Sequence, residues 1–208
     1  MSIEMLFAFI TASVILLSIP GPTILTVISY SISHGNKAKV PLVAAVALGD
    51  STALFLSLVG LGVVLAKSAF LFQVIKIVGG VYLLYLGYKL LKAGLKSEEI
   101  SFEKNTVSKK KLFMDTYLVT ALNPKGIIFF VSFLPQFMNP NGNVPYQLWT
   151  LAITFVVLAT LNASLYALFA SKAKEYLTSA KSQKRFNIVG GSLLSIAGIW
   201  ALNAKQAS

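Results

Sequence analysis

The stretch "LLSIPGPTILTVIS", residues 16–29, is apolar enough to lie in a membrane, yet it carries Pro20, Gly21 and Pro22 near its centre. A proline inside a helix lacks the backbone N–H and crowds the preceding turn, which costs about 3 kcal/mol or more. The hydrocarbon core of a bilayer offers no water to the carbonyl groups that lose their partners. The interruption therefore predicts a cavity or a bound polar ligand in the middle of a membrane helix.

The whole chain has the composition of an integral membrane protein. Its 208 residues are 56% hydrophobic and 12% charged, and the mean hydropathy is +0.75, outside the usual range of globular proteins. The apolar segments reach the roughly 20 residues that a membrane-spanning helix needs, and none alternates like a strand of an outer-membrane barrel. We expect an all-α integral membrane protein with one domain over 1–208. Glu4 stands where a signal peptide would be basic, so the first segment is expected to be retained.

Several functional classes are excluded by residues that the chain lacks. Without cysteine there is no disulfide, no thiolate metal site and no thiol-electron carrier. The net charge of +11 is assigned to loops that set topology and meet anionic headgroups, so no nucleic-acid partner is expected. The lone histidine, His34, is interpreted as a solvated loop residue, and Asp115 as an interfacial one. No enzymatic activity, cofactor or metal site is predicted.

Six apolar segments predict six transmembrane helices. The first, third and fifth connections carry 14 lysines and arginines, whereas only Lys67 and Lys205 lie on the opposite side. Because positive charge is retained in the cytoplasm, we expect both termini outside and the basic loop 93–111 in the cytoplasm. The predicted spans are 5–32, 40–66, 69–91, 112–135, 147–171 and 186–203.

The two halves of the chain, about 1–92 and 112–208, resemble each other. "IVGGVYLLYLG" at 77–87 matches "IVGGSLLSIAG" at 188–198. The glycines of both copies predict close-packed helix faces, either within the bundle or between the protomers of a homo-oligomer.

The repeat extends to the polar and proline positions. Asp50 in the second span corresponds to Asn162 in the fifth, and "IPGP" at 19–22 in the first span corresponds to "NPK" at 123–125 in the fourth. Three spans per half invert the second copy. We therefore expect a 3+3 inverted-topology repeat with broken helices 1 and 4, which is typical of secondary transporters with a site at the midplane.

The breaks and the charges at their depth predict a site for a small zwitterion. Half-helices that begin near Thr23 and Lys125 present positive amino ends, which favour a carboxylate. Asp50 lies about 18 Å into its span at 1.5 Å per residue, and a charge at that depth is by default functional. A purely structural Asp50–Lys125 ion pair is the alternative. The predicted binding residues are Pro20, Gly21, Pro22, Thr23, Asp50, Asn123, Pro124, Lys125 and Asn162.

Asp50 is also the predicted proton carrier. Burial disfavours its charge and a bound ammonium group favours it, so that occupancy and protonation are coupled. The carbonyl groups of Leu16, Ser18 and Thr120, which lose their helical partners to the prolines, are expected to offer further contacts to the ammonium group.

The order of these motifs resembles a known family. "SIPGP", "GD" at 49–50, "GGVYLLYLG" at 79–87, and "NPK" followed by "PQF" at 135–137 resemble the LysE/RhtB amino-acid exporters over nearly the whole chain. The "NPK" form is closer to the RhtB branch. One departure is Lys39, because the family usually has a glycine between Gly35 and the second span.

The resemblance implies a six-span inner-membrane exporter that uses the proton motive force to expel amino acids or derivatives such as lysine, arginine, homoserine, threonine or leucine. The direction of transport rests on the resemblance alone. One alternative is a small cation or metal-ion transporter of a related family, which the single histidine and single deep carboxylate disfavour. A non-transporting membrane scaffold is the other.

Overall fold

The computed structural model describes residues 1–65, 69–95, 107–139 and 141–203, and every regular element in these ranges is a helix. The predicted all-α class is therefore confirmed. In chain order the elements are α1 (Ile3–Ser18), α2 (Pro22–His34), α3 (Asn36–Leu65), α4 (Ala69–Leu95), α5 (Lys109–Ala121), α6 (Pro124–Phe133), the 3₁₀ helix η1 (Leu134–Phe137), α7 (Val144–Leu168), α8 (Ala170–Thr178) and α9 (Ala180–Asn203).

Helix boundaries follow local sequence signals. The side chains of Ser2, Ser108 and Asn143 accept backbone N–H groups at the starts of α1, α5 and α7, as capping residues do. Gly35 ends α2 with φ at +60°, a conformation that glycine adopts without strain. Lys39 then lies inside α3, so this glycine is sufficient for the turn.

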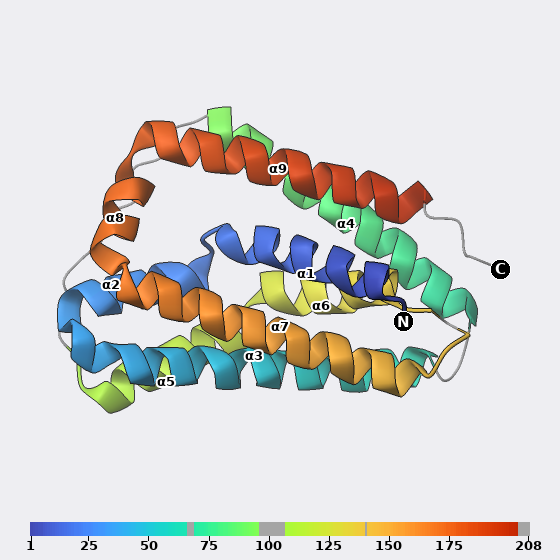
Figure 1. The fold of residues 1–208 in the computed structure, drawn as a ribbon, viewed down its shortest axis with the longest axis horizontal. Coiled ribbons are helices and arrows are strands. Elements are labelled where there is room, and N and C mark those ends of the chain that lie inside the picture. The colour runs from blue at the N-terminus through green and yellow to red at the C-terminus, as the bar shows by residue number, and fades with distance from the viewer. Residues whose placement is uncertain (66–68, 96–106, 140, 204–208) are drawn as a thin grey trace.

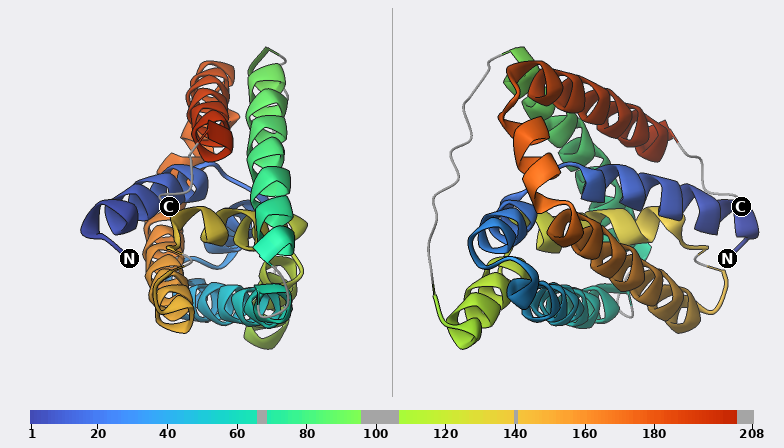
Figure 2. Two further views of the ribbon diagram at one scale, coloured as in Figure 1. Left: turned by 90° about the vertical axis from the view of Figure 1, so that its right-hand side faces the viewer. Right: turned by 60° about the vertical axis from the view of Figure 1, so that its left-hand side comes forward.

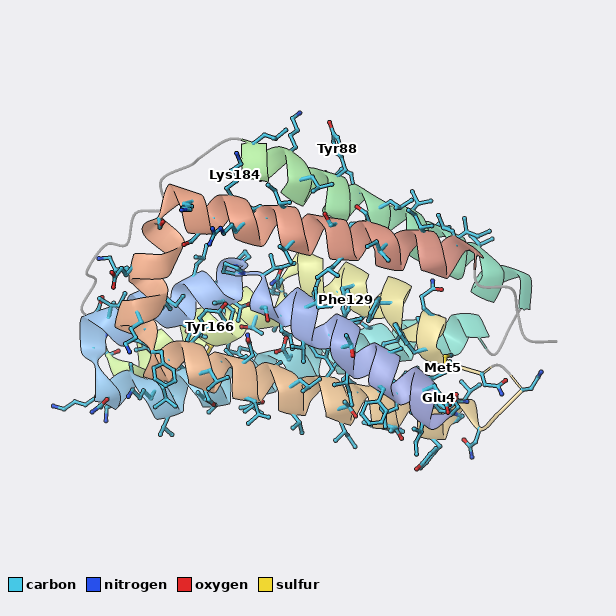
Figure 3. All side chains as sticks on the ribbon, turned by 45° about the horizontal axis from the view of Figure 1, so that its top comes forward. Glu4, Met5, Tyr88, Phe129, Tyr166 and Lys184 are labelled. Carbon is cyan, nitrogen blue, oxygen red and sulfur yellow. The ribbon has the colours of Figure 1, made fainter. Side chains whose placement is uncertain are left out.

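The long helices run lengthwise between two ends of the molecule (Figure 1). We call one end the basic end: it carries the α2–α3 turn, the start of α5, helix α8 and the start of α9, where Figure 3 shows Lys184. The opposite end, which carries the start of α1 with Glu4 and the end of α9, is the terminal end. The predicted basic connections thus gather at one end.

Two single helices among the described residues are long and apolar enough to cross a membrane. They are α3 over 36–60 and α7. Helices α1 and α2 meet the same criterion as a pair, bent by 54° at the break between them. Length and composition thus support two spans, or three if the bent pair is one span, in the described part of the chain.

Helices α4 and α9 form a closely packed pair (Figure 2). A Cβ atom added to Gly87 would lie 2.8 Å from the carbonyl oxygen of Gly191, and one added to Gly191 would lie 2.8 Å from that of Gly87. A Cβ atom on Gly198 would lie 3.0 Å from the carbonyl oxygen of Gly80. The predicted close-packed glycine faces therefore lie within one chain, where they let two helix backbones approach.

Among the described residues, the rest of the bundle has three clusters of buried apolar residues: a small one at Ile24 and Ile28 of α2, and two larger cores. Toward the terminal end lies the phenylalanine core, in which aromatic rings of α1, α6, η1 and α7 pack together: Phe9, Phe129, Phe130, Phe133, Phe137 and Phe155. Toward the basic end lies the aliphatic core, formed by α2, α3, α5 and α7: Val27, Ala38, Leu42, Val46, Leu112, Ala163 and Ala167. The breaks between α1 and α2 and between α5 and α6 lie between these cores.

Candidate functional site

A cavity of about 70 Å³ lies between the two helix breaks. Its polar lining comes from four elements or breaks, through the side chains of Thr23, Asp50, Asn123 and Asn162. Its apolar lining joins the two cores: Val46 belongs to the aliphatic core, and Phe130 and Phe155 belong to the phenylalanine core. The cavity therefore combines one carboxylate and two carboxamides with an apolar wall.

The first break separates α1 from α2 and is held by two side chains of α7. Asn162 donates from Nδ2 to the carbonyl oxygen of Leu17 at 3.1 Å, and the Tyr166 hydroxyl donates to that of Ser18 at 3.0 Å. Figure 3 shows Tyr166 on α7 beside this region. Pro22 cannot donate to Ser18, so Tyr166 supplies the missing donor. The carbonyl oxygen of Leu16 accepts from the N–H of Ile19 at 3.2 Å.

The second break separates α5 from α6 at Leu122 and Asn123. The N–H of Asn123 donates to the carbonyl oxygen of Thr120 at 3.2 Å, so this carbonyl also has a partner within the chain. The carboxamide of Asn123 lies 3.5 Å from the hydroxyl oxygen of Thr23, at the start of α2. The starts of α2 and α6 are thus neighbours, and from there these helices run toward opposite ends of the molecule (Figure 1).

Asp50 reaches the cavity from α3, at a point where α3 and α5 are close together. A Cβ atom added to the preceding residue, Gly49, would lie 2.7 Å from the Cβ atom of Thr120. One turn of α3 carries both Val46 and Asp50 into the cavity lining. The carboxylate therefore lies beside the second break and near the amino end of α2, whose unpaired N–H groups give it partial positive charge.

Five of the predicted site residues line this one cavity: Gly21, Thr23, Asp50, Asn123 and Asn162. Pro20 lies in the first break, Pro22 begins α2, and the backbone of Pro124 begins α6. The side chains of Pro124 and Lys125, and with them the alternative Asp50–Lys125 ion pair, lie outside the described residues. The freed carbonyl groups differ from expectation, because Leu16, Ser18 and Thr120 have partners in the protein.

Sequence reasoning missed the aromatic wall and the Tyr166 donor. A helical spacing was the available signal: Phe155 and Ala159 precede Asn162 by about two turns and one turn on the same face of α7, and Tyr166 follows it by one turn. Within the described ranges no group of three or more His, Asp or Glu residues could hold a metal ion.

The prediction that His34 is a solvated loop residue is wrong. His34 is the last residue of α2 and is half-buried. Its Nε2 atom lies 2.9 Å from the backbone nitrogen and 3.0 Å from the carbonyl oxygen of Val107, and its Nδ1 atom lies 3.2 Å from the carbonyl oxygen of Tyr30. His34 at the end of α2 and its partner Val107 are 73 residues apart, so no local sequence pattern indicated that they meet.

The family comparison decides what kind of protein carries this cavity. The model of the LysE type translocator family matches residues 14–204. The chain belongs to the LysE family. Members of this family are membrane translocators and not enzymes, and the predicted resemblance is confirmed.

Three relatives of this LysE-family chain span most of its length. It is 34% identical to the uncharacterized membrane protein YrhP of Bacillus subtilis, over 93% of this chain and 96% of the relative. It is 28% identical to the homoserine/homoserine lactone efflux protein of Salmonella typhimurium over the full length of both. It is 29% identical to the leucine efflux protein of Klebsiella pneumoniae over 90% and 88% of the two chains. No solved structure matches the chain.

Proposed function

We propose that this protein exports amino acids or small amino-acid derivatives across the inner membrane, in exchange for protons. The observation that carries the proposal is the cavity at which both helix breaks, Asp50 and two carboxamides meet. The names of the full-length relatives, which describe efflux of homoserine, homoserine lactone and leucine, support the substrate class.

The cavity offers complementary groups to each part of an amino acid. The substrate carboxylate would face the amino ends of α2 and α6, where backbone N–H groups are unpaired. The ammonium group would face Asp50, with Asn123 and Asn162 as neutral partners. The substrate side chain would lie against Phe130 and Phe155.

Substrate is exchanged for protons because one carboxylate, that of Asp50, binds both cations. A proton and a substrate ammonium group compete for Asp50, so the protonated carrier releases substrate and the deprotonated carrier binds it. After each exported molecule, a proton that enters from outside thus occupies Asp50 while the carrier returns without substrate. The cavity of about 70 Å³ is smaller than the roughly 300 Å³ at which ligand pockets begin, so substrate binding requires helices around the cavity to move apart.

The proposed framework is six spans in a 3+3 inverted repeat, with α1–α2 and α5–α6 as broken spans. The α4–α9 contacts support it: the repeat places Gly80 on Gly191 and Gly87 on Gly198, and the contact of Gly80 with Gly198 has its counterpart in that of Gly191 with Gly87. A two-fold pseudo-symmetry between the halves requires that each such contact be matched by its counterpart in this way.

We place the basic end in the cytoplasm and both termini outside, following the retention of positive charge. Reporter fusions after Lys92 and at the carboxyl terminus test this orientation. A cytoplasm-active reporter is expected to be active after Lys92 and inactive at the carboxyl terminus. The reverse pattern would overturn the orientation.

Transport itself is tested with inside-out vesicles that contain the protein and are acidified inside. Uptake of labelled homoserine and leucine is expected to rise with the pH gradient and to collapse when a protonophore is added. Asp50→Asn is expected to lose gradient-driven uptake, because a carboxamide cannot alternate between proton and ammonium. Ser51→Ala, an exposed neighbour on α3, is the matched control. Uptake by Asp50→Asn at the wild-type rate would contradict the coupling role, and absence of uptake for every amino acid would contradict the function.

A further inference from the structure

Helices α2 and α5 are joined at the basic end by polar contacts. The Tyr30 hydroxyl donates to Oδ2 of Asp115 at 2.7 Å. One turn further along α2, His34 accepts the N–H of Val107, just before the start of α5, at 2.9 Å. The Tyr30 and His34 rings also contact each other, with centroids 5.9 Å apart. We call these two hydrogen bonds the α2–α5 contacts.

Next to the α2–α5 contacts along their helices are two buried hydroxyl groups that have no hydrogen-bond partner among the described residues. Ser31 on α2 is 5% exposed and Thr116 on α5 is 0% exposed, and their hydroxyls have no partner among the described residues. Nearby hydroxyls in the same helices, such as that of Thr120, donate to the carbonyl oxygen four residues earlier. A buried hydroxyl that lacks any partner is unfavourable, so the arrangement around Ser31 and Thr116 suits a state in which water reaches them.

Both hydroxyls border the aliphatic core. Ser31 follows Val27 by one turn and Thr116 follows Leu112 by one turn, and these two apolar residues belong to that core. Val46 connects the core to the cavity, since it belongs to the one and lines the other. Ser31 lies between Tyr30 and His34 on α2, and Thr116 directly follows Asp115 on α5, so both hydroxyls lie at the level of the α2–α5 contacts and beside the aliphatic core that leads to the cavity.

The terminal end is closed by aromatic packing, although buried polar side chains such as Gln136 and Gln147 lie there as well. There the rings of Phe9 and Phe137 lie 5.4 Å apart, and those of Phe129 and Phe133 lie 4.1 Å apart. Ser13 of α1, one turn after Phe9, is 0% exposed and also lacks a hydrogen-bond partner in this part of the structure. It is a buried serine of the same kind beside an aromatic core.

We propose that the interface between α2 and α5 is the passage between the basic end and the cavity, and that the α2–α5 contacts hold it closed. The inference rests on the proposed transport function and adds the route that the substrate takes. When α2 and α5 separate, Ser31 and Thr116 line the passage and bind water or substrate. The buried residues of the aliphatic core are valines, leucines and alanines without an aromatic ring, so separating α2 and α5 displaces smaller groups than the rings of the phenylalanine core.

The absence of cysteine from the chain allows a direct test. Single cysteines replace the buried hydroxyl residues as Ser31→Cys and Thr116→Cys, with Ser13→Cys as the matched control. Each variant is reconstituted and exposed, from one membrane face at a time, to a charged thiol reagent that does not cross the membrane. We expect Ser31→Cys and Thr116→Cys to react only from the face that carries the basic end, and Ser13→Cys not to react from that face.

Adding Tyr30→Phe removes the hydroxyl that donates to Asp115. We expect this change to speed the labelling of Ser31→Cys and Thr116→Cys by about tenfold, the effect of one hydrogen bond to a charged group. The labelling of Ser13→Cys should not change. Asp115→Asn, which keeps an acceptor but removes its charge, provides a second variant with a smaller acceleration in case Tyr30→Phe does not fold.

The outcomes separate this proposal from the transport function. Equal labelling of all three cysteines, or no acceleration by either Tyr30→Phe or Asp115→Asn, overturns the passage even if amino acids are transported. Accelerated labelling in a protein that transports no amino acid supports an opening at this interface and overturns the proposed function instead. Labelled Ser31→Cys is further expected to lose transport, because the added group blocks the passage.

Discussion

The two ends of the bundle are closed by different chemistry. The phenylalanine core toward the terminal end contains large rings, with Phe130 and Phe155 edge to face at 4.8 Å. The buried residues of the aliphatic core toward the basic end are valines, leucines and alanines, and polar contacts such as that of Tyr30 with Asp115 lie beside them. Ring packing contributes many small contacts that are lost only when the whole core opens, whereas two hydrogen bonds can be exchanged for water. We therefore expect the basic end to open more readily than the terminal end.

The proposed repeat makes this difference more informative. Ser13 lies on α1 before the first break, and Asp115 lies on α5 before the second break. The helix before the second break thus carries an acid that binds a tyrosine, whereas the helix before the first break carries a serine beside phenylalanines.

The largest expected effect is the loss of a ring from the phenylalanine core. Phe133→Ala is expected to lower the free energy of unfolding by about 3–5 kcal/mol, because it removes a fully buried ring and leaves a void; Phe133 is 1% exposed. Thermal unfolding in detergent measures the change. Phe7→Ala is the control, since Phe7 is 65% exposed. Equal destabilisation by both variants would show that the ring packing does not hold this end together.

A smaller effect is expected at the boundary between the two cores. Tyr166→Phe removes the donor to the carbonyl oxygen of Ser18, and an unpaired buried carbonyl costs about 1–3 kcal/mol. Transport should fall together with stability, since the break shapes the cavity. Tyr146→Phe on the same helix is the control, because Tyr146 is 67% exposed. If both variants unfold at the same temperature, Tyr166 does not support the break.

Much of the helical framework is predictable from the sequence. The apolar segments 40–66 and 69–91 correspond to α3 and α4, and the prolines mark both breaks to within a few residues. These features depend on local composition and on the missing proline N–H, which any single sequence displays. The basic connection before the last segment also contains α8, a short helix that its composition did not reveal.

The cavity lining was predictable only where residues are polar. Asp50 and Asn162 are rare in apolar segments and can be noticed without coordinates, whereas Phe130 and Phe155 are two among 14 phenylalanines. Which rings face inward depends on how α6 turns against α7, and that is a tertiary property. The same holds for His34 and Val107, which are far apart in sequence and meet only in the folded chain.

The smallest effect is expected from Lys111→Gln at the basic end. Lys111 pairs with Asp115 at 3.3 Å, one helical turn apart, but the two side chains are 61% and 34% exposed. Exposed pairs of this spacing contribute about 0.3–0.5 kcal/mol, so the variant should unfold within a degree or two of the wild type. The labelling rate of Ser31→Cys should likewise stay within about twofold, as such an energy implies. Lys111→Gln and Tyr30→Phe each remove one partner of the Asp115 carboxylate. They differ because Lys111 lies on the same helix as Asp115, whereas Tyr30 binds Asp115 from α2. A large acceleration by Lys111→Gln would mean that the charge balance of α5, and not its hydrogen bond to α2, keeps the basic end closed.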